Sequence, residues 1–184
     1  MEKFILGLFL VFFKTNLDFI DSGIVYYATN FFGYGLMYLG VRDLKAGHEK
    51  MGKVQPLVIV MICHSIFFFV LNSTGHSAGS IPLSTAAGFA LSISLLALAA
   101  VGTMMVTIIL SLFISAMSDR LYSISRLEVN VGLMLGSMVL ASVLVFTLQP
   151  LAYFSMGLVL LVQLVFIIRL YKMGRSRNDL VSEV

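Results

Sequence analysis

Long apolar segments alternate with short polar ones along the whole chain of 184 residues. A helix that crosses the hydrocarbon core of a bilayer needs about 20 mainly apolar residues, and about 17 is the lower limit. The segments that approach or exceed this length are Phe4–Ile20, Ile24–Val41, Pro56–Asn72, Leu83–Met117, Leu127–Thr147 and Leu151–Tyr171. The pattern therefore predicts an all-α fold, a polytopic transmembrane helical bundle of six helices.

The fourth segment, Leu83–Met117, is longer than one crossing needs and too short for two crossings joined by a turn. At about 1.5 Å per residue it would reach about 52 Å as one helix. We expect a kink or break near Gly88 or Gly102, or a helix that projects beyond the membrane. A split into two crossings would give seven helices.

The basic residues distinguish six crossings from seven. Nine of the twelve lie in the loop after the second segment, in the loop after the fourth and in the C-terminal tail: Arg42, Lys45, Lys50, Lys53, Arg120, Arg126, Lys172, Arg175 and Arg177. The loop Ser73–Pro82 contains neither Lys nor Arg. Because basic loops stay in the cytoplasm, a single crossing by the fourth segment predicts a six-helix protein with both termini cytoplasmic. We expect residues 1–173 to form one transmembrane domain and residues 174–184 to form a polar cytoplasmic tail.

Composition supports a lipid environment. The chain is 59% hydrophobic and 11% charged, with a mean hydropathy of +1.01, whereas soluble domains contain about 25% charged residues. The net charge of +3 is scattered and forms no basic stripe with interleaved aromatic residues, which argues against nucleic-acid binding. Cys63 is the single cysteine, so no internal disulfide and no cysteine pair for zinc is available.

Two helices contain small residues at spacings that suit close helix packing. These are Gly33 and Gly40 in the second segment, and Gly132 and Gly136, which form Gly-x-x-x-Gly, in the fifth. Small residues let helix backbones approach in lipid, where no hydrophobic force drives helices together. They indicate contacts within this chain or a homodimer face, and we favour contacts within the chain.

Catalytic motifs are absent from the sequence. It contains no His-Glu-x-x-His, no Gly-x-Ser-x-Gly and no P-loop. His48 and His76 lie in loops on opposite faces of the expected topology, so they cannot share a metal. We therefore expect a protein that is not an enzyme and that has no metal or cofactor, although an intramembrane enzyme remains a third class of function.

Polar residues inside the apolar segments are the candidates for a ligand or ion path: Lys14, Asp18, Asn30, His64 and Gln163. An ionisable group at mid-membrane costs at least about 2.5–3.5 kcal/mol and usually persists because it faces a cavity, a partner or a path. Lys14 and Asp18 are four residues apart, a spacing at which two side chains meet on one helix face.

Each candidate also has a purely structural interpretation. Lys14 and Asp18 could form an ion pair at the outer mouth of the bundle. His64 could bond a backbone carbonyl or a serine within the bundle. Asn30 and Gln163 could join helices through hydrogen bonds, as amide side chains do in membranes.

The segment Asn30–Leu44 contains a Phe-x-Gly-Tyr stretch followed by an apolar helix and a Leu-Gly-x-basic ending. It resembles a segment of small uncharacterised polytopic membrane proteins of Gram-positive bacteria. The resemblance implies a bacterial plasma membrane and no particular activity.

The expected function is that of a non-enzymatic membrane subunit that binds a small ligand or a partner protein. The size and helix count are similar to those of substrate-binding subunits of energy-coupling-factor transporters. The alternative is an autonomous secondary transporter, with Lys14, Asp18 and His64 as a proton or ion relay. The expected partners are the lipid bilayer and either a membrane protein or a second copy of the chain.

Overall fold

The computed structural model describes residues 1–16, 23–45, 48–77, 80–82, 84–117 and 124–182. Its helices are α1 (Glu2–Phe12), α2 (Ile24–Lys45), α3 (Val54–Ser73), α4 (Ala86–Met117), α5 (Ile124–Thr147) and α6 (Gln149–Ser182), with a short 3₁₀ helix, η1 (Glu49–Lys53), before α3. These described residues contain helices and no strand, which confirms the all-α prediction.

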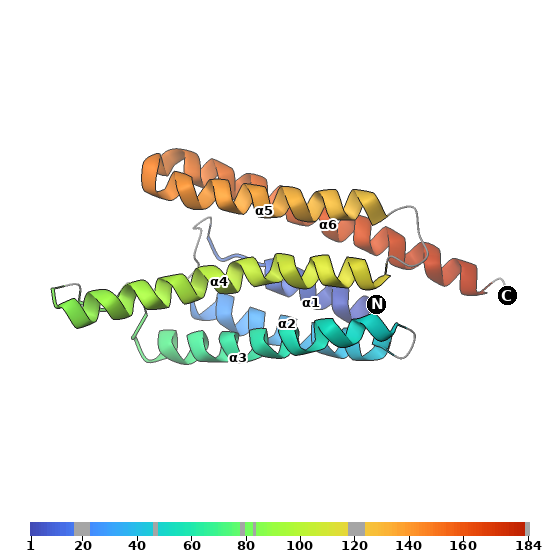
Figure 1. Cartoon of the computed structure of the whole chain (residues 1–184), viewed down its shortest axis with the longest axis horizontal. Coiled ribbons are helices and arrows are strands. Elements are labelled where there is room, and N and C mark those ends of the chain that lie inside the picture. The colour runs from blue at the N-terminus through green and yellow to red at the C-terminus, as the bar shows by residue number, and fades with distance from the viewer. Residues whose placement is uncertain (17–22, 46–47, 78–79, 83, 118–123, 183–184) are drawn as a thin grey trace.

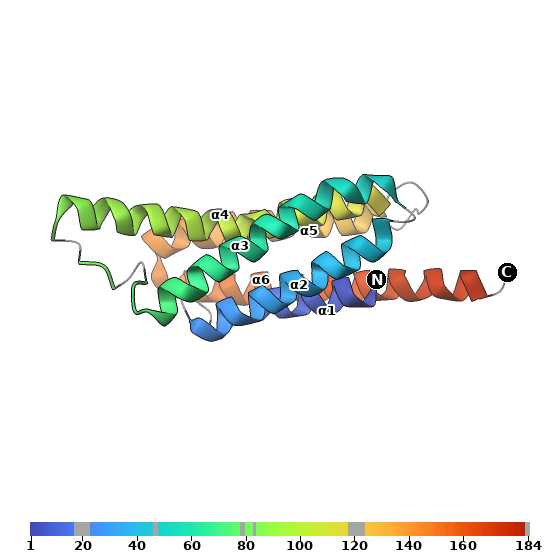
Figure 2. The same ribbon diagram turned by 90° about the horizontal axis from the view of Figure 1, so that it is seen from below.

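The helices form a closed ring in chain order. Each helix packs on the next one, and α6 returns to pack on α1. Successive helices run in opposite directions along the long axis of the molecule, so the N-terminus and the C-terminal end of α6 lie at the same end (Figures 1 and 2). The alternation follows from the short connections between long helices, which leave the chain no room to return before the next helix begins.

The interior of the ring is apolar and closely packed. Phe4 of α1 stacks on Phe113 of α4 with ring centroids 3.8 Å apart, and Phe166 of α6 is fully buried in the same cluster. The outer surface is apolar too, and Phe154, for example, is 76% exposed. Such a surface is unfavourable in water and suits contact with lipid tails.

Helices long and apolar enough to cross a membrane occur over Glu49–Ser73, Ala86–Met117, Arg126–Val145 and Pro150–Arg175. This chain is therefore a membrane protein with transmembrane helices. In the described residues, α1 and α2 do not meet the same criteria of length and composition, because α1 has 11 residues and α2 is rich in polar, tyrosine and glycine residues. The count of six crossings stays a prediction.

The first helix is shorter than predicted. It ends at Phe12 instead of continuing to Ile20, and Phe13 already has extended backbone angles. Thr15 and Asn16 follow in non-helical conformations, and both residue types disfavour helix by restricted rotamers or by competing for backbone hydrogen bonds. Lys14 therefore lies beyond the end of α1, not halfway along a helix.

The fourth and sixth helices are longer than one crossing needs. Helix α4 has 32 residues without a non-helical interruption, and its N-terminal part reaches past the ends of α3 and α5 (Figures 1 and 2). It crosses the molecule once, as six helices require; a kink at Gly88 or Gly102 stays a prediction. Helix α6 continues to Ser182, so the residues expected to form a polar tail begin as the end of a helix.

The basic residues gather at one end of the bundle. One end of the bundle contains the N-terminus of α1, η1, the start of α5 and the end of α6 (Figure 1). Among the described residues, every Lys and Arg except Lys14 lies at this end. Lys3 and Asp43 form an ion pair there, with Nζ and Oδ2 2.7 Å apart, which ties the start of α1 to the end of α2.

Candidate functional site

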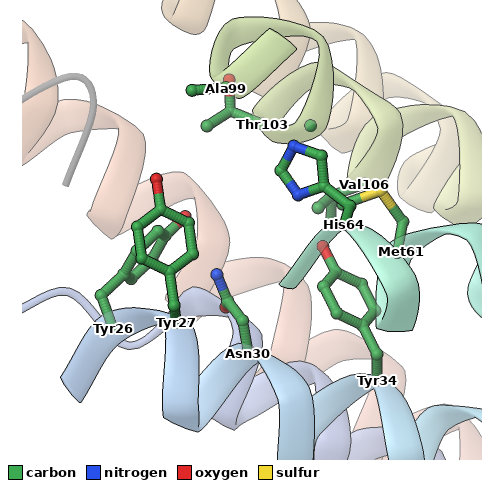
Figure 3. A pocket seen from close by; sticks show the side chains of 10 residues that line it. Tyr26, Tyr27, Asn30, Tyr34, Met61, His64, Ala99, Thr103 and Val106 are labelled. Atoms are coloured by element: carbon green, nitrogen blue, oxygen red, sulfur yellow. The ribbon is translucent and has the colours of Figure 1, made fainter. Parts of the chain in front are cut away.

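A small cavity lies between α2, α3 and α4 (Figure 3). Its volume is about 20 Å³, enough for about one water molecule or a ligand of that size. The lining residues are Tyr26, Tyr27, Asn30, Tyr34, Met61, His64, Ala99, Gly102, Thr103 and Val106. Asn30 and His64, two of the candidates from the sequence, therefore share one cavity.

His64 projects from α3 and is fixed against α4. Its Nε2 lies 3.1 Å from the backbone oxygen of Leu98, and its ring centroid lies 4.7 Å from that of Phe68. The ring occupies the space that a side chain at Gly102 would need. The sequence places a glycine on α4 where the imidazole approaches most closely.

This contact sets the proton positions on the imidazole. A carbonyl oxygen only accepts, so Nε2 donates to Leu98, and a neutral ring then leaves Nδ1 as an acceptor. Figure 3 shows that the ring nitrogen turned away from α4 points toward Asn30 and Tyr34. His64 thus presents a hydrogen-bond acceptor to the cavity.

Asn30 and Tyr34 reach the cavity from α2. They are 6% and 1% exposed, and both side chains point toward His64 (Figure 3). Within the described residues, Oδ1 of Asn30 is buried without a hydrogen-bond partner, and the Tyr34 hydroxyl makes no hydrogen bond. Buried polar groups are normally paired, so an amide and a hydroxyl left unpaired beside a cavity indicate a bound water or ligand.

Aromatic rings enclose the other side of the cavity. Tyr27 stacks on Phe68 with centroids 5.2 Å apart, and Tyr26 meets Tyr27 edge to face at 5.1 Å. The Nζ of Lys14 lies 4.4 Å from the centroid of the Tyr26 ring. A cation at that distance is attracted by the negative face of the ring.

Lys14 is close to the cavity without lining it. Its Nζ is buried and has no hydrogen-bond partner among the described residues. Asp18, the expected partner of Lys14, lies outside the described residues. The expected pairing requires both residues to lie on one helix, and Lys14 lies beyond the end of α1 at Phe12.

Gln163 lies elsewhere, on α6. It is 5% exposed, and its Oε1 has no hydrogen-bond partner within the described residues. It does not line the cavity, so the structure does not join all the candidates in one pocket. Nearer the basic end, Arg169 of α6 donates to Oδ1 of Asn130 on α5 at 2.8 Å, which gives that amide oxygen a partner from the protein.

The glycines selected from the sequence fall into two groups. A Cβ at Gly33 would lie 2.7 Å from the backbone oxygen of Gly7, and one at Gly40 would lie 2.7 Å from the backbone nitrogen of Phe4. A Cβ at Gly132 or Gly136 would meet no atom within 4 Å among the described residues. The contacts within the chain that we expected are therefore seen for Gly33 and Gly40 and are not seen for Gly132 and Gly136.

The tyrosines of the cavity were missed in the sequence, although a signal for them exists. Tyr26, Asn30 and Tyr34 follow one another at intervals of four, which places them on one face of a helix. A helical projection around Asn30 would have found them. Thr103 has no such signal, since only the packing of α4 against α3 brings it to the cavity.

The described residues contain no group of three or more His, Cys, Asp or Glu side chains that could hold a metal ion.

No protein-family model, curated protein or solved structure matches this chain.

Proposed function

We propose that this chain is a non-enzymatic integral membrane subunit that binds a small polar ligand in the cavity between α2, α3 and α4. The observation that carries this proposal is the convergence of Asn30, Tyr34 and Nδ1 of His64 on one cavity, where the Tyr34 hydroxyl and Nδ1 have no hydrogen-bond partner among the described residues. An apolar bundle that only needed stability would fill this space with aliphatic side chains, because unpaired polar groups cost about 1–3 kcal/mol each.

The proposal includes six crossings of a bacterial plasma membrane with both termini in the cytoplasm. The supporting observation is that the N-terminus, the C-terminal end of α6 and the basic helix ends share one end of the bundle. Single cysteines introduced into a Cys63→Ala background test this orientation. A cysteine at Ser77 should react with an impermeant thiol reagent from outside intact cells, and one at Lys50 should not. The reverse accessibility contradicts the orientation.

Ligand binding is tested by thermal unfolding of the purified chain in mild detergent with a panel of small polar solutes. A ligand of the cavity should raise Tm in the wild type and have a weaker effect in Tyr34→Phe, which removes one hydroxyl and keeps the ring. Tyr153→Phe is the matched control, because Tyr153 is exposed on α6 and does not line the cavity. A solute effect that is equal in both variants contradicts binding at this site.

Purification from native membranes tests whether the chain acts as a subunit. A second membrane protein that copurifies in fixed stoichiometry supports the subunit. Its absence, together with uptake of the ligand by liposomes that contain only this chain, favours the second candidate, a proton-coupled secondary transporter. The observation behind that second candidate is that a titratable imidazole faces the cavity.

A further inference from the structure

We infer that the line of contact between α5 and α6, here called the α5–α6 seam, binds an anionic phospholipid at the basic end of the bundle, with Arg169 on the lipid phosphate. This surface is separate from the cavity, and the inference does not depend on the proposed function. Arg169 lies six residues before the end of the apolar span Pro150–Arg175. Six residues of helix correspond to about 9 Å, a depth from which a long arginine side chain can extend to the headgroups.

The Arg169 guanidinium is held across the seam but is not neutralised there. Its Nη1 donates to Oδ1 of Asn130 at 2.8 Å and lies 3.5 Å from the backbone oxygen of Arg126. Both acceptors are uncharged, and no carboxylate among the described residues forms an ion pair with Arg169. The side chain is exposed, so other donors of its planar fork are free for a further partner. A charge on a lipid-facing surface normally has an opposite charge beside it.

The neighbouring charges favour an anionic headgroup. Lys172 lies three residues after Arg169, on the same face of α6, and Arg126 lies beside the contact on α5; both are exposed. Glu128 on α5 forms no ion pair with these residues. Guanidinium and phosphate groups pair through two parallel hydrogen bonds, and basic surfaces between transmembrane helices bind anionic headgroups. A zwitterionic headgroup also has a phosphate, but its ammonium group would be repelled by Lys172 and Arg126.

An exposed apolar stripe runs along α6 from Arg169 toward the middle of the span. It consists of Val165, Leu161 and Leu158, which follow Arg169 at intervals of four, four and three residues and therefore share its helix face. All three side chains are exposed. A phospholipid has its phosphate at the membrane surface and its acyl chains toward the bilayer centre. The order of basic and apolar residues on this face matches that arrangement, whereas a free phosphate ion would use only the basic part.

The experiment measures lipid binding to the full chain in mild detergent by native mass spectrometry. The probes are phosphatidylglycerol and phosphatidylcholine with identical acyl chains, so that only the headgroup differs. Phosphatidylglycerol should bind about tenfold or more tightly than phosphatidylcholine, because only its net charge complements the seam. Arg169→Gln should weaken phosphatidylglycerol binding about tenfold or more, because a charge-assisted pair with the phosphate is lost.

Two further variants separate binding at the seam from folding and from general attraction. Lys172→Gln leaves the contact between Arg169 and Asn130 intact and should weaken phosphatidylglycerol binding about fivefold. Lys53→Gln is the matched control, because it removes an exposed positive charge from the same end of the bundle but outside the α5–α6 seam. Its binding of phosphatidylglycerol should stay within about twofold of the wild type, since distant exposed charges are screened.

Three results would overturn the inference. Equal binding of the two lipids would show that the seam does not select an anionic headgroup. Equal losses in Lys53→Gln and in the two seam variants would mean that the whole basic end attracts lipid without a site. Displacement of the lipid by inorganic phosphate at the same concentration would show that the apolar stripe contributes nothing. Losses confined to Arg169→Gln and Lys172→Gln, without displacement by phosphate, support a phospholipid site.

Discussion

Glycines occur both at the contact between α1 and α2 and on the outer face of α5, but only those at the first site are in close contact with another helix. At the first, Gly33 and Gly40 bring two backbones together, with Gly7 opposite Gly33. At the second, Gly132 and Gly136 leave open space among the described residues. A glycine at helical spacing therefore allows a close contact without specifying one, and the partner helix decides whether the space is filled.

The close contact explains how a short helix belongs to the bundle. Helix α1 has only 11 residues, yet Phe4 and Leu8 are fully buried. Glycines on both helices let α1 sit deep on α2, so that those side chains reach the central cluster instead of the surface. In lipid, such packing replaces the hydrophobic effect as the force between helices.

The largest effect is expected from Gly40→Leu. A side chain there meets the backbone of Phe4, which cannot move aside as a flexible side chain could. The free energy of unfolding should fall by about 3 kcal/mol or more, and α1 should separate from α2. Thermal unfolding in detergent measures the loss, and Gly132→Leu is the matched control. Equal stability of the two variants would show that α1 does not pack on α2 as described.

Gly102→Ala should have an intermediate effect. The added methyl group displaces the His64 ring, which then loses its hydrogen bond to Leu98. We expect a loss of about 1–3 kcal/mol in the free energy of unfolding, together with a change in the imidazole nitrogen chemical shifts measured by NMR. Unchanged shifts would mean that the ring does not rest against α4, and the acceptor role of Nδ1 would lose its basis.

The double change Gly132→Ala and Gly136→Ala should have an effect within about 1 kcal/mol, and a gain is expected because alanine favours helix over glycine. The Tm should also be independent of protein concentration. A large loss of stability, or a loss that depends on concentration, would show that a second chain covers the α5 face. The glycines of α1 and α2 would then form a contact within one chain, and those of α5 would form a contact between two chains.

The smallest effect concerns the ion pair at the start of the α1–α2 contact. The hydrogen bond from Lys3 lowers the pKa of Asp43 from its ordinary value of 3.8. The stabilisation is therefore present above the ordinary value and is lost as the pH falls through the lowered value in the folded protein. Because the pair is exposed, the contribution is small.

Asp43→Asn tests the pair. Between pH 6 and pH 3, the Tm of the wild type should fall slightly more than that of the variant. This difference between the two proteins should be smaller at high salt. Identical pH profiles would show that the pair contributes nothing to the contact between α1 and α2.

Much of the architecture follows from the sequence alone. Apolar length and low charge determine a helical membrane protein, because backbone groups in lipid must be bonded within the segment. The positions of Lys and Arg predict the alternation of the helices, and the structure arranges the helix ends accordingly. Asn30 and His64 can be recognised in the sequence because polar groups are rare inside apolar segments of this length.

The tertiary structure decided what sequence patterns leave open. The apolar run Phe4–Ile20 predicts a helix that includes Lys14, but α1 ends at Phe12, and the residues Thr15 and Asn16 that follow are poor helix formers. The contact of His64 with Gly102 depends on how α3 crosses α4, which no local pattern encodes. Small residues lack the side-chain bulk that selects a partner. Only the packing of the six helices decides that Gly40 lies in a contact with α1 and that Gly132 lies on the outer surface.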